Sequence, residues 1–335
     1  ETSIDPARAA QTYSAAGKLV TPGLIDFHTH CWREGGPLGT DPDTLAKEEC
    51  TTTLVSAGDC GAATLPAWRD SMAKYKARTF AFVNVSTVGY SGFPESEYLD
   101  LNYQNAAKVA AALQEHADVA LGVKVRPTYA LLPPSDSLNS VGRALDACNQ
   151  AGLGFRMMCH IGALEVPSHM TQLLNVGYRA GDICTHCFSD FLNAQNQQTG
   201  FVQGGTMLSA VTAAKARGVL FDVAHGPNGY DATVAQICFT AGFRPDIISS
   251  DSTSLVPPFG VTGRCHLVDV MSKLLALGMS LDDVIRGATV TPAQVINRIP
   301  LLGTLQVGAP GDVAVLGLSG NTLTAVQAFI GGVQL

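Results

Sequence analysis

Residues 23–32, "GLIDFHTHCW", place His28 and His30 one residue apart behind a run of apolar residues, in a chain with only eight histidines. Side chains at positions i and i+2 of a strand point to the same side of a sheet, so a strand here presents both imidazoles together. One buried histidine satisfied by a backbone carbonyl is common, but two at one strand tip need two partners in the same place. A metal ion supplies both, and the pair therefore predicts a metal site.

Short β-rich runs alternate with longer amphipathic runs over most of the chain. The predicted strands are residues 23–30, 51–59, 79–86, 119–126, 153–160, 182–188, 218–226 and 245–251. Between them apolar residues recur at three and four positions, as in a helix packed on a sheet, over 105–117, 141–152, 170–181, 206–218 and 233–243. This alternation predicts parallel pairing with right-handed crossovers, and eight such units predict a closed (β/α)8 TIM barrel in the α/β class.

The two ends of the chain have a different sequence pattern from the alternating strands and helices between them. Helices are expected over 268–278, 280–289 and 291–299, the last with Thr291 as its N-cap and Pro292 as its first residue. From residue 303 the pattern changes to short strands separated by Gly/Pro turns, and the first twenty residues are similar. We therefore expect residues 1–20 and 303–335 to form a small β-sandwich domain beside a barrel of residues 21–302.

Composition limits the classes of partner. The 335 residues carry a net charge of −7 with no basic cluster, which disfavours nucleic acid and anionic membranes. No apolar run reaches the ~18 residues of a membrane span, and the polar first residues do not resemble a secretory signal. Because the sequence does not begin with Met, it leaves open whether a leader or a first strand precedes it. Nine scattered cysteines are typical of reduced thiols in a cytoplasmic protein, and we expect the lone CxxC of Cys184 and Cys187 to be two buried thiols.

Further candidate ligands stand at the ends of other predicted strands. Lys124, His160, His186 and Asp251 each follow an apolar run that is expected to form barrel wall. Active sites of this fold lie at the C-terminal ends of the strands. Convergence of these residue types at one rim is what a metal centre requires.

Together these motifs resemble the amidohydrolase superfamily, in the deacetylase branch related to dihydroorotases, over nearly the whole chain. The resemblance rests on "PGLIDFHTH", the strand-4 lysine, the single histidines after strands 5 and 6, the strand-8 aspartate, and the exit "PAQVINRIPLLGTLQVGAPGDVAVL". It implies a binuclear metal centre, usually zinc, as the cofactor of a hydrolase. One metal ion would be held by His28, His30 and Asp251, and the other by His160 and His186, with a carboxylated Lys124 bridging both. An unmodified ammonium has no lone pair to give, whereas a carbamate offers one oxygen to each metal.

The implied chemistry is hydrolysis of an amide or ester bond in a small N-acyl amino acid or acylated hydroxy acid. A water that bridges two cations has its pKa lowered from ~15.7 toward ~7, so hydroxide is available at neutral pH. Asp251 is then the catalytic general base, which takes the proton of the nucleophile and delivers it to the leaving group.

Two residues are candidates for binding substrate. Arg126 shares a strand face with Lys124 and could grip a carboxylate with two hydrogen bonds, or form a salt bridge within the rim. His225 ends the seventh strand and could bind substrate or stabilise an oxyanion. Asp59, Cys60 and Thr128 lie near other strand tips and are assigned no role.

Two other functions are open. A cyclic-amide hydrolase of the dihydroorotase or hydantoinase type would use the same metals with a differently shaped pocket. A metal-free, assembly-forming relative would be structural and not an enzyme, but all six ligand positions are filled here. The expected partners are a small-molecule substrate and, because relatives often form dimers or larger rings, further copies of the chain.

Overall fold

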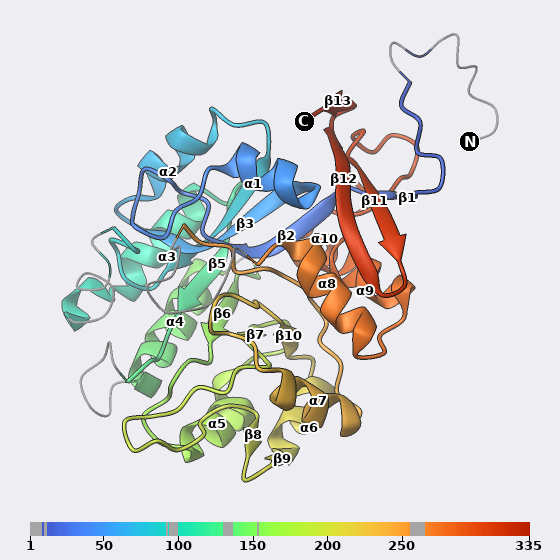
Figure 1. The fold of residues 1–335 in the computed structure, drawn as a ribbon. Coiled ribbons are helices and arrows are strands. Elements are labelled where there is room, and N and C mark those ends of the chain that lie inside the picture. The colour runs from blue at the N-terminus through green and yellow to red at the C-terminus, as the bar shows by residue number, and fades with distance from the viewer. Residues whose placement is uncertain are drawn as a thin grey trace.

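The computed structural model describes residues 9, 12–91, 93, 100–129, 137–152, 154–254 and 265–335, and it forms a parallel barrel with a small antiparallel sheet beside it (Figure 1). The barrel strands are β2 Leu24–Thr29, β3 Thr51–Gly61, β4 Arg78–Asn84, β5 Ala120–Val125, β6 Arg156–His160, β7 Ile183–Thr185 and β10 Leu220–Asp222. They pair in the order β10-β7-β6-β5-β4-β3-β2, and every pair is parallel. The predicted strands 1 to 7 are thereby confirmed.

The eighth predicted strand closes the barrel through isolated bridges and not through a continuous ladder. Ile247 pairs with Asp222 of β10, and Ser252 pairs with Thr29 of β2, both in parallel. Between these bridges Asp251 has a φ of 53°, in the left-handed region that interrupts a regular strand. The irregular segment 247–252 therefore joins the two edges of the seven-stranded sheet, and the TIM barrel prediction is confirmed.

Helices cover the outer face of the barrel. They are α1 Pro42–Glu49, α2 Leu65–Met72, α3 Ala106–Glu115, α4 Ser137–Ala151, α5 Ser168–Gln172, α6 Ser209–Ala216, α7 Ala232–Thr240, α8 Leu267–Ala276, α9 Leu281–Gly287 and α10 Val290–Val295. A π-helical turn, η3 Leu173–Gly177, continues α5, a 3₁₀ turn, η2 Leu101–Tyr103, precedes α3, and β8 Val202–Gln203 pairs with β9 Thr206–Met207. None of the described helices is long and apolar enough to span a membrane.

The predicted start of the last helix is wrong by two residues. Thr289, not Thr291, precedes the first helical residue of α10, and the amide of Ala293 donates to the carbonyl of Thr289 at 3.1 Å. Pro292 therefore lies within the first turn. Proline is tolerated there, because the amides of the first turn have no partner within the helix.

Two apolar layers hold the barrel together. One cluster draws Phe27, Phe82, Met158 and Ile183 from strands around the barrel and so fills its interior. A second cluster lies between strands and helices, and it includes both cysteines of the CxxC, which are fully buried free thiols. Thr185 follows Ile183 by two residues on β7, so it occupies the next interior layer toward the C-terminal rim.

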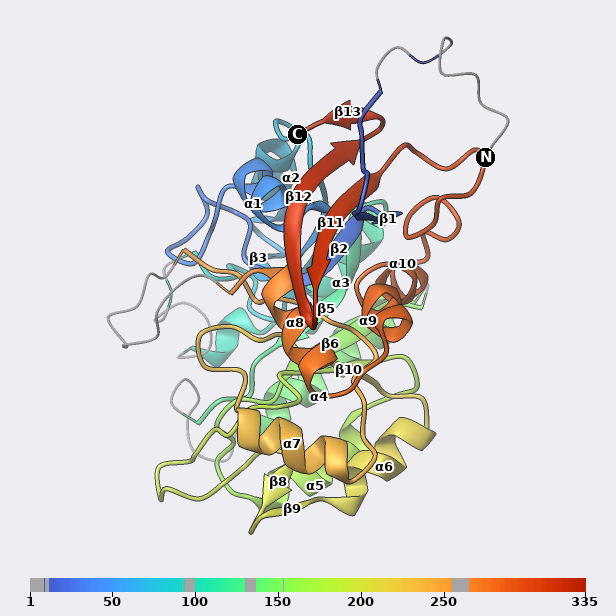
Figure 2. The same cartoon turned by 45° about the vertical axis from the view of Figure 1, so that its right-hand side comes forward.

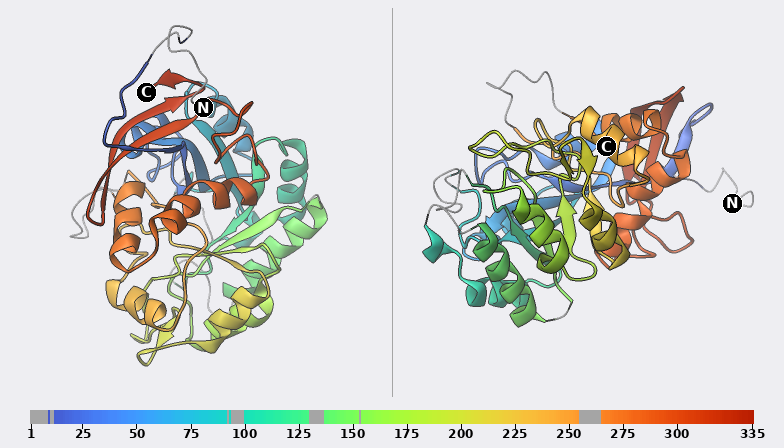
Figure 3. Two further views of the ribbon diagram at one scale, coloured as in Figure 1. Left: turned by 90° about the vertical axis from the view of Figure 1, so that its right-hand side faces the viewer. Right: turned by 90° about the horizontal axis from the view of Figure 1, so that it is seen from below.

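The small sheet is built from both chain ends, as predicted. Its strands are β1 Leu19–Pro22, β11 Val313–Ser319, β12 Thr322–Ile330 and β13 Val333–Gln334, in the order β1-β11-β12-β13, all antiparallel. The sheet stands beside α8, where the amide of Leu323 donates to the hydroxyl of Ser272 at 2.9 Å (Figure 2). In the left view of Figure 3, the orange helices lie between the red strands and the yellow part of the barrel. The residue boundaries between the two units stay a prediction.

A buried pair of carboxyl groups fastens the irregular eighth segment to its neighbours. Asp26 of β2 accepts hydrogen bonds from the amide, at 3.0 Å, and the hydroxyl of Ser250. The hydroxyl of Ser252 donates to Glu49 of α1 at 2.9 Å. Burial raises the pKa of Asp26 to about 6, and burial together with the charge of Asp26 raises the pKa of Glu49 well above its usual value.

We expect the substitution Glu49→Gln to reduce the loss of stability at high pH. A carboxyl group whose pKa is raised by folding keeps in the folded chain a proton that the unfolded chain has released, so the free energy of unfolding falls as the pH rises above the ordinary value of 4.5. Urea unfolding at about pH 5 and about pH 8 measures this loss. Glu48→Gln, at the exposed neighbouring position, is the matched control and should behave like the wild type. An equal loss in Glu49→Gln and the wild type would contradict the prediction.

Candidate metal centre

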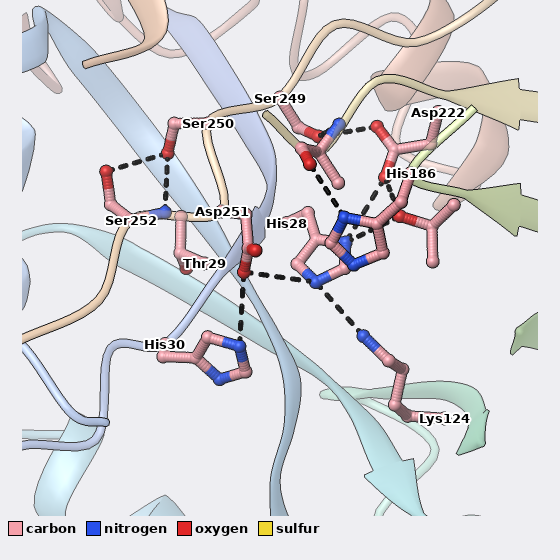
Figure 4. A network of polar contacts seen from close by, with 12 residues as sticks. His28, Thr29, His30, Lys124, His186, Asp222, Ser249, Ser250, Asp251 and Ser252 are labelled. Carbon is pink, nitrogen blue, oxygen red and sulfur yellow. Dashed lines mark hydrogen bonds and ion pairs between the residues drawn. The ribbon is translucent and has the colours of Figure 1, made fainter. Parts of the chain in front are cut away.

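The candidate ligands come together at the C-terminal rim of the barrel, from strands far apart in the sequence (Figure 4). One nitrogen each from His28 and His186 and one carboxylate oxygen of Asp251 lie within 4.8 Å of one another. The Nε2 atoms of His28 and His30 converge on the same oxygen of Asp251, at 3.5 Å and 3.2 Å. The expectation that both strand-1 histidines face one point is therefore confirmed.

Lys124 reaches the same point from β5. Its side chain is only 1% exposed, and its Nζ lies 3.0 Å from Nε2 of His28. Gly58 of β3 lies beside it, where an added Cβ would come within 2.7 Å of Cγ of Lys124. The lysine thus extends along the barrel interior toward the histidines and does not turn outward.

Among the candidate ligands, His186 gives the clearest indication of a metal site. Its Nδ1 lies 2.8 Å from the carbonyl of Ala224, which can only accept, so Nδ1 carries the proton and Nε2 a free lone pair. Within the described residues, this buried Nε2 has no hydrogen-bond partner. Buried polar atoms rarely remain unpaired, and a nitrogen lone pair beside a carboxylate suits a divalent cation such as zinc. The residues present therefore fit a metal ion.

His160 stands next to His186 but outside the tightest group. The two imidazole centroids are 4.0 Å apart. Nε2 of His160 lies beside Gly162, where an added Cβ would approach it to 2.6 Å. The group of three that could hold one ion takes its members from both predicted ligand sets, so the division of ligands between two metals stays a prediction.

Burial and the charges at the centre favour neutral forms of His28, His160 and His186 and an ionised aspartate. Burial and the charge of Lys124 hold the pKa of His28 well below its usual value, and burial lowers the pKa of His186 to about 4. Burial lowers the pKa of His160 as well. Burial would raise the pKa of Asp251, but the hydrogen bond with His30 and the charge of His186 hold it below its usual value. Neutral imidazoles and a carboxylate are the forms that bind metal.

A carboxylate from β3 orients His30. Oδ1 of Asp59 lies 2.5 Å from Nδ1 of His30, and Oδ2 accepts from the amide of Cys31 at 2.9 Å and the hydroxyl of Ser56 at 2.8 Å. Burial would lower the pKa of His30, but the charge of Asp59 and the contacts with Asp251 raise it to about 9. Asp59 is a residue of the candidate site that the sequence left without a role, although its place at a strand end was visible.

His28 is held in a similar way from the other side of the barrel. Its Nδ1 lies 2.8 Å from the hydroxyl of Thr185 on β7 and 3.2 Å from Oδ2 of Asp222 on β10. Asp222 is fully buried, and burial raises its pKa to about 7 against the opposing hydrogen bonds from Ser249 and Thr185. The only sequence signal for Asp222 is an acidic residue inside the apolar run "VLFDVA".

A cavity of about 230 Å³ opens above the ligand cluster. Arg126 lines it, with its guanidinium 5.7 Å from the ring centre of Tyr90 and 5.2 Å from that of Phe93. Phe191 and Thr128 line it as well, and the buried hydroxyl of Thr128 has no hydrogen-bond partner among the described residues. The cavity thus combines a cation, aromatic rings and one unpaired hydroxyl.

His225 lies at the mouth of the barrel but is absent from the lining of this cavity. Its Nδ1 donates to the carbonyl of Gly226 at 2.8 Å, and Nζ of Lys273 on α8 donates to Nε2 at 2.6 Å. Its ring stacks on Tyr230 with the centres 4.6 Å apart. The structure therefore brings Arg126 to the ligand cluster and directs His225 toward α8, and substrate binding by either stays a prediction.

Relatives with known names extend over most of the chain, although no protein-family model matches it. It is 26% identical over 320 residues to Deacetylase Atu3266 of Agrobacterium fabrum, covering 95% of this chain and 75% of that one. It is also 26% identical over 314 residues to a deacetylase of Enterococcus faecalis, covering 93% of this chain and 81% of that one.

Two solved structures share the fold. An adenine deaminase aligns with a TM-score of 0.84 at 24% identity, covering 95% of this chain and 87% of that one. A dihydroorotase aligns with a TM-score of 0.76 at 24% identity, covering 94% of this chain and 92% of that one. With these likenesses in sequence and in fold, the resemblance to the amidohydrolase superfamily that the strand-end motifs predicted is confirmed.

Proposed function

We propose that this chain is a metal-dependent hydrolase that cleaves the amide or ester bond of a small N-acyl amino acid or acylated hydroxy acid. The observation that carries the proposal is Nε2 of His186, which has no hydrogen-bond partner in the described part of the chain and faces His28 and Asp251 below an open cavity. The relatives named deacetylase support removal of an acyl group over other hydrolytic reactions.

The proposed ligand set follows the superfamily pattern. His28, His30 and Asp251 hold one divalent cation, His160 and His186 hold a second, and a carboxylated Lys124 is shared. Bound zinc ions would acidify water and polarise the scissile carbonyl. Lys124 takes part only after its amine has added CO₂, because an ammonium group would repel the cations that the neighbouring histidines bind.

Asp251 moves the proton in the proposed reaction. Its lowered pKa keeps it ionised at neutral pH, so it can accept a proton from the attacking water. As the new C–O bond forms and the C–N or C–O bond to the leaving group breaks, the same carboxyl delivers the proton to the departing atom. Gly226 allows the carboxylate this position, because an added Cβ would lie 2.3 Å from its Oδ2.

The cavity lining suggests how the substrate is held. Arg126 offers planar paired donors to the carboxylate of an amino or hydroxy acid. The hydroxyl of Thr128, which has no partner among the residues that the structure describes, could bond a second polar group of the substrate. The rings of Tyr90, Phe93 and Phe191 provide apolar contact for the rest of the molecule.

Purified protein should contain about two zinc ions per chain and should hydrolyse N-acyl amino acids or acylated hydroxy acids. Elemental analysis and a screen of these compounds together with cyclic ureides measure both properties, and removal of metal by a chelator should abolish activity until zinc is returned. Hydrolysis of the cyclic compounds alone would favour a dihydroorotase or hydantoinase type of reaction. Protein that neither holds divalent metal nor gains activity from it would favour the structural role.

Lys124 should carry one carbamate group per chain. Protein prepared with ¹³C-labelled bicarbonate should show a carbamate carbon signal by NMR, and Lys124→Met should lack it. Lys273→Met, at an exposed lysine of α8, is the control and should retain the signal. The same spectrum for the Lys124 variant and the wild type would exclude the modification.

Asp251→Asn should lower kcat/KM by at least ~100-fold, because the variant loses both the general base and a charged ligand. The activity should be assayed with zinc in excess, so that weaker metal binding is separated from loss of the base. Asp190→Asn, at an exposed position beyond β7, should keep wild-type activity. A fully active Asp251→Asn variant would remove Asp251 from the mechanism.

A further inference from the structure

A carboxylate from another strand lies behind each of the two strand-1 histidines, His28 and His30. His30 contacts Asp59 of β3 directly, whereas His28 contacts Thr185, which in turn contacts Asp222 of β10. Asp222 itself does not line the cavity, and it is fully buried. It therefore acts through its neighbours if it acts on the metal centre at all.

We propose that Asp222, together with Thr185, is a positioning residue that fixes His28 in the tautomer with its proton on Nδ1. The Nε2 lone pair of His28 is then presented to the ligand cluster. The metal ion it would meet there rests on the proposed function, but the tautomer itself is a property of this chain alone.

The directions of three hydrogen bonds support this assignment. In its ionised form Asp222 can only accept, so the hydroxyl of Ser249 then donates to Oδ1 of Asp222 at 2.5 Å and the hydroxyl of Thr185 donates to Oδ2 at 2.7 Å. A threonine hydroxyl has a single hydrogen. Because that hydrogen is committed to Asp222, the oxygen of Thr185 can only accept from Nδ1 of His28, 2.8 Å away.

The direct contact agrees with the relayed one. Oδ2 of Asp222 also lies 3.2 Å from Nδ1 of His28. Both neighbours of this nitrogen are therefore acceptors, and neither could donate a hydrogen bond to it. Nδ1 must then carry the proton. On the other side of the ring, Nε2 faces Asp251 at 3.5 Å and Lys124 at 3.0 Å, where the candidate ligands gather. Groups behind a metal-binding histidine that fix its ring and tautomer typically change metal affinity by 10–100-fold.

A change from carboxylate to amide at position 222 reverses the direction of these hydrogen bonds without changing the shape of the side chain. In Asp222→Asn, the NH₂ group donates to the oxygen of Thr185, and the hydroxyl of Thr185 is released to donate to Nδ1 of His28. The proton of the imidazole then moves to Nε2, where it blocks the lone pair. We therefore expect the variant to fold and to bind metal poorly.

The experiment compares metal-free proteins that contain ¹⁵N-labelled histidine. Two-bond proton–nitrogen NMR spectra distinguish the two tautomers, and a His28→Gln variant identifies the signals of His28. The wild type and Thr185→Ser, which keeps the hydroxyl, should show the Nδ1–H form. Asp222→Asn should shift to the Nε2–H form, and its zinc affinity in a competition titration should fall by at least ~10-fold.

Thr185→Val tests the relay separately, because it removes the hydroxyl and retains a similar shape. It should bind zinc less tightly than Thr185→Ser, because Nδ1 of His28 then keeps only its 3.2 Å contact with Oδ2 of Asp222. Asp182→Asn is the control for a purely structural role. Asp182 is buried and accepts from the amide of Met157 at 2.8 Å, far from His28 along the barrel, and its variant should lose stability but keep the tautomer.

Retention of the Nδ1–H form and of wild-type zinc affinity in Asp222→Asn would overturn the proposal. If that variant does not fold, identical zinc affinities of Thr185→Val and Thr185→Ser would overturn it instead. A wild type that binds no divalent metal but shows the expected change of tautomer would contradict the proposed function and leave the inference about Asp222 intact.

Discussion

The constraint on which this site depends is the burial of several nitrogen ligands and a lysine within a few ångströms of one another. His28, His186 and Lys124 are each at most 2% exposed, and their mutual charges, with burial, disfavour protonated imidazoles. Burying these polar groups in the barrel lowers the free energy of unfolding unless each polar atom has a partner. The structure supplies partners to the inner nitrogens of the rings and leaves the outer nitrogens directed at Asp251.

The support for the ligands is a polar layer between the apolar interior and the rim. Asp222 lies two residues after Leu220 on β10, and Thr185 lies two residues after Ile183 on β7, so each sits one layer above an apolar side chain. Oxygen atoms of this layer meet the underside of His28, and Asp59 does the same for His30. The rings are thereby fixed by groups that a substrate in the cavity never reaches. The orientation of the imidazole rings at the rim thus depends on hydrogen bonds from the layer of side chains below it.

Sequence periodicity was sufficient for the barrel because alternation along the chain is a local pattern, and it also placed the candidate ligands at strand ends, where their metal-binding role stays a prediction. Alternation along a strand predicts that His28 and His30 share a face, and an apolar run predicts which residue stands at a strand end. The first strand is nevertheless not regular: its register with β3 shifts between Asp26 and Thr29. Such a bulge re-aims side chains, and nothing in the letters "DFHT" distinguishes it from a regular strand.

The supporting residues could not be predicted because their roles depend on pairings between distant strands. Asp222 meets His28 across 194 positions of sequence, and that contact follows only from the closed order of strands. His225 shows the converse case, in which a residue with the strand-end pattern does not point into the cavity. Its position at a strand end is shared with the ligands, but a φ of 41° at Ala224 and of 49° at Gly226 turns the chain there, and the side chain meets α8.

Backbone conformation at the rim explains why the side chains of some strand-end residues meet at one point and those of others do not. His186 and Asp251 have φ values of 70° and 53°, in the left-handed region that is unfavourable for residues with a Cβ. His186 follows β7 directly, and Asp251 lies in the irregular segment 247–252, so neither residue is held in regular strand alternation and each side chain can turn over the mouth of the barrel. The hydrogen bonds from Nδ1 of His186 to Ala224, at 2.8 Å, and from the amide of Asp251 to the carbonyl of His28, at 2.7 Å, hold these turns in place. His186 and Asp251 thus carry a conformational cost that lets their side chains leave the regular strand direction and meet at one point, as a site for a shared ion requires.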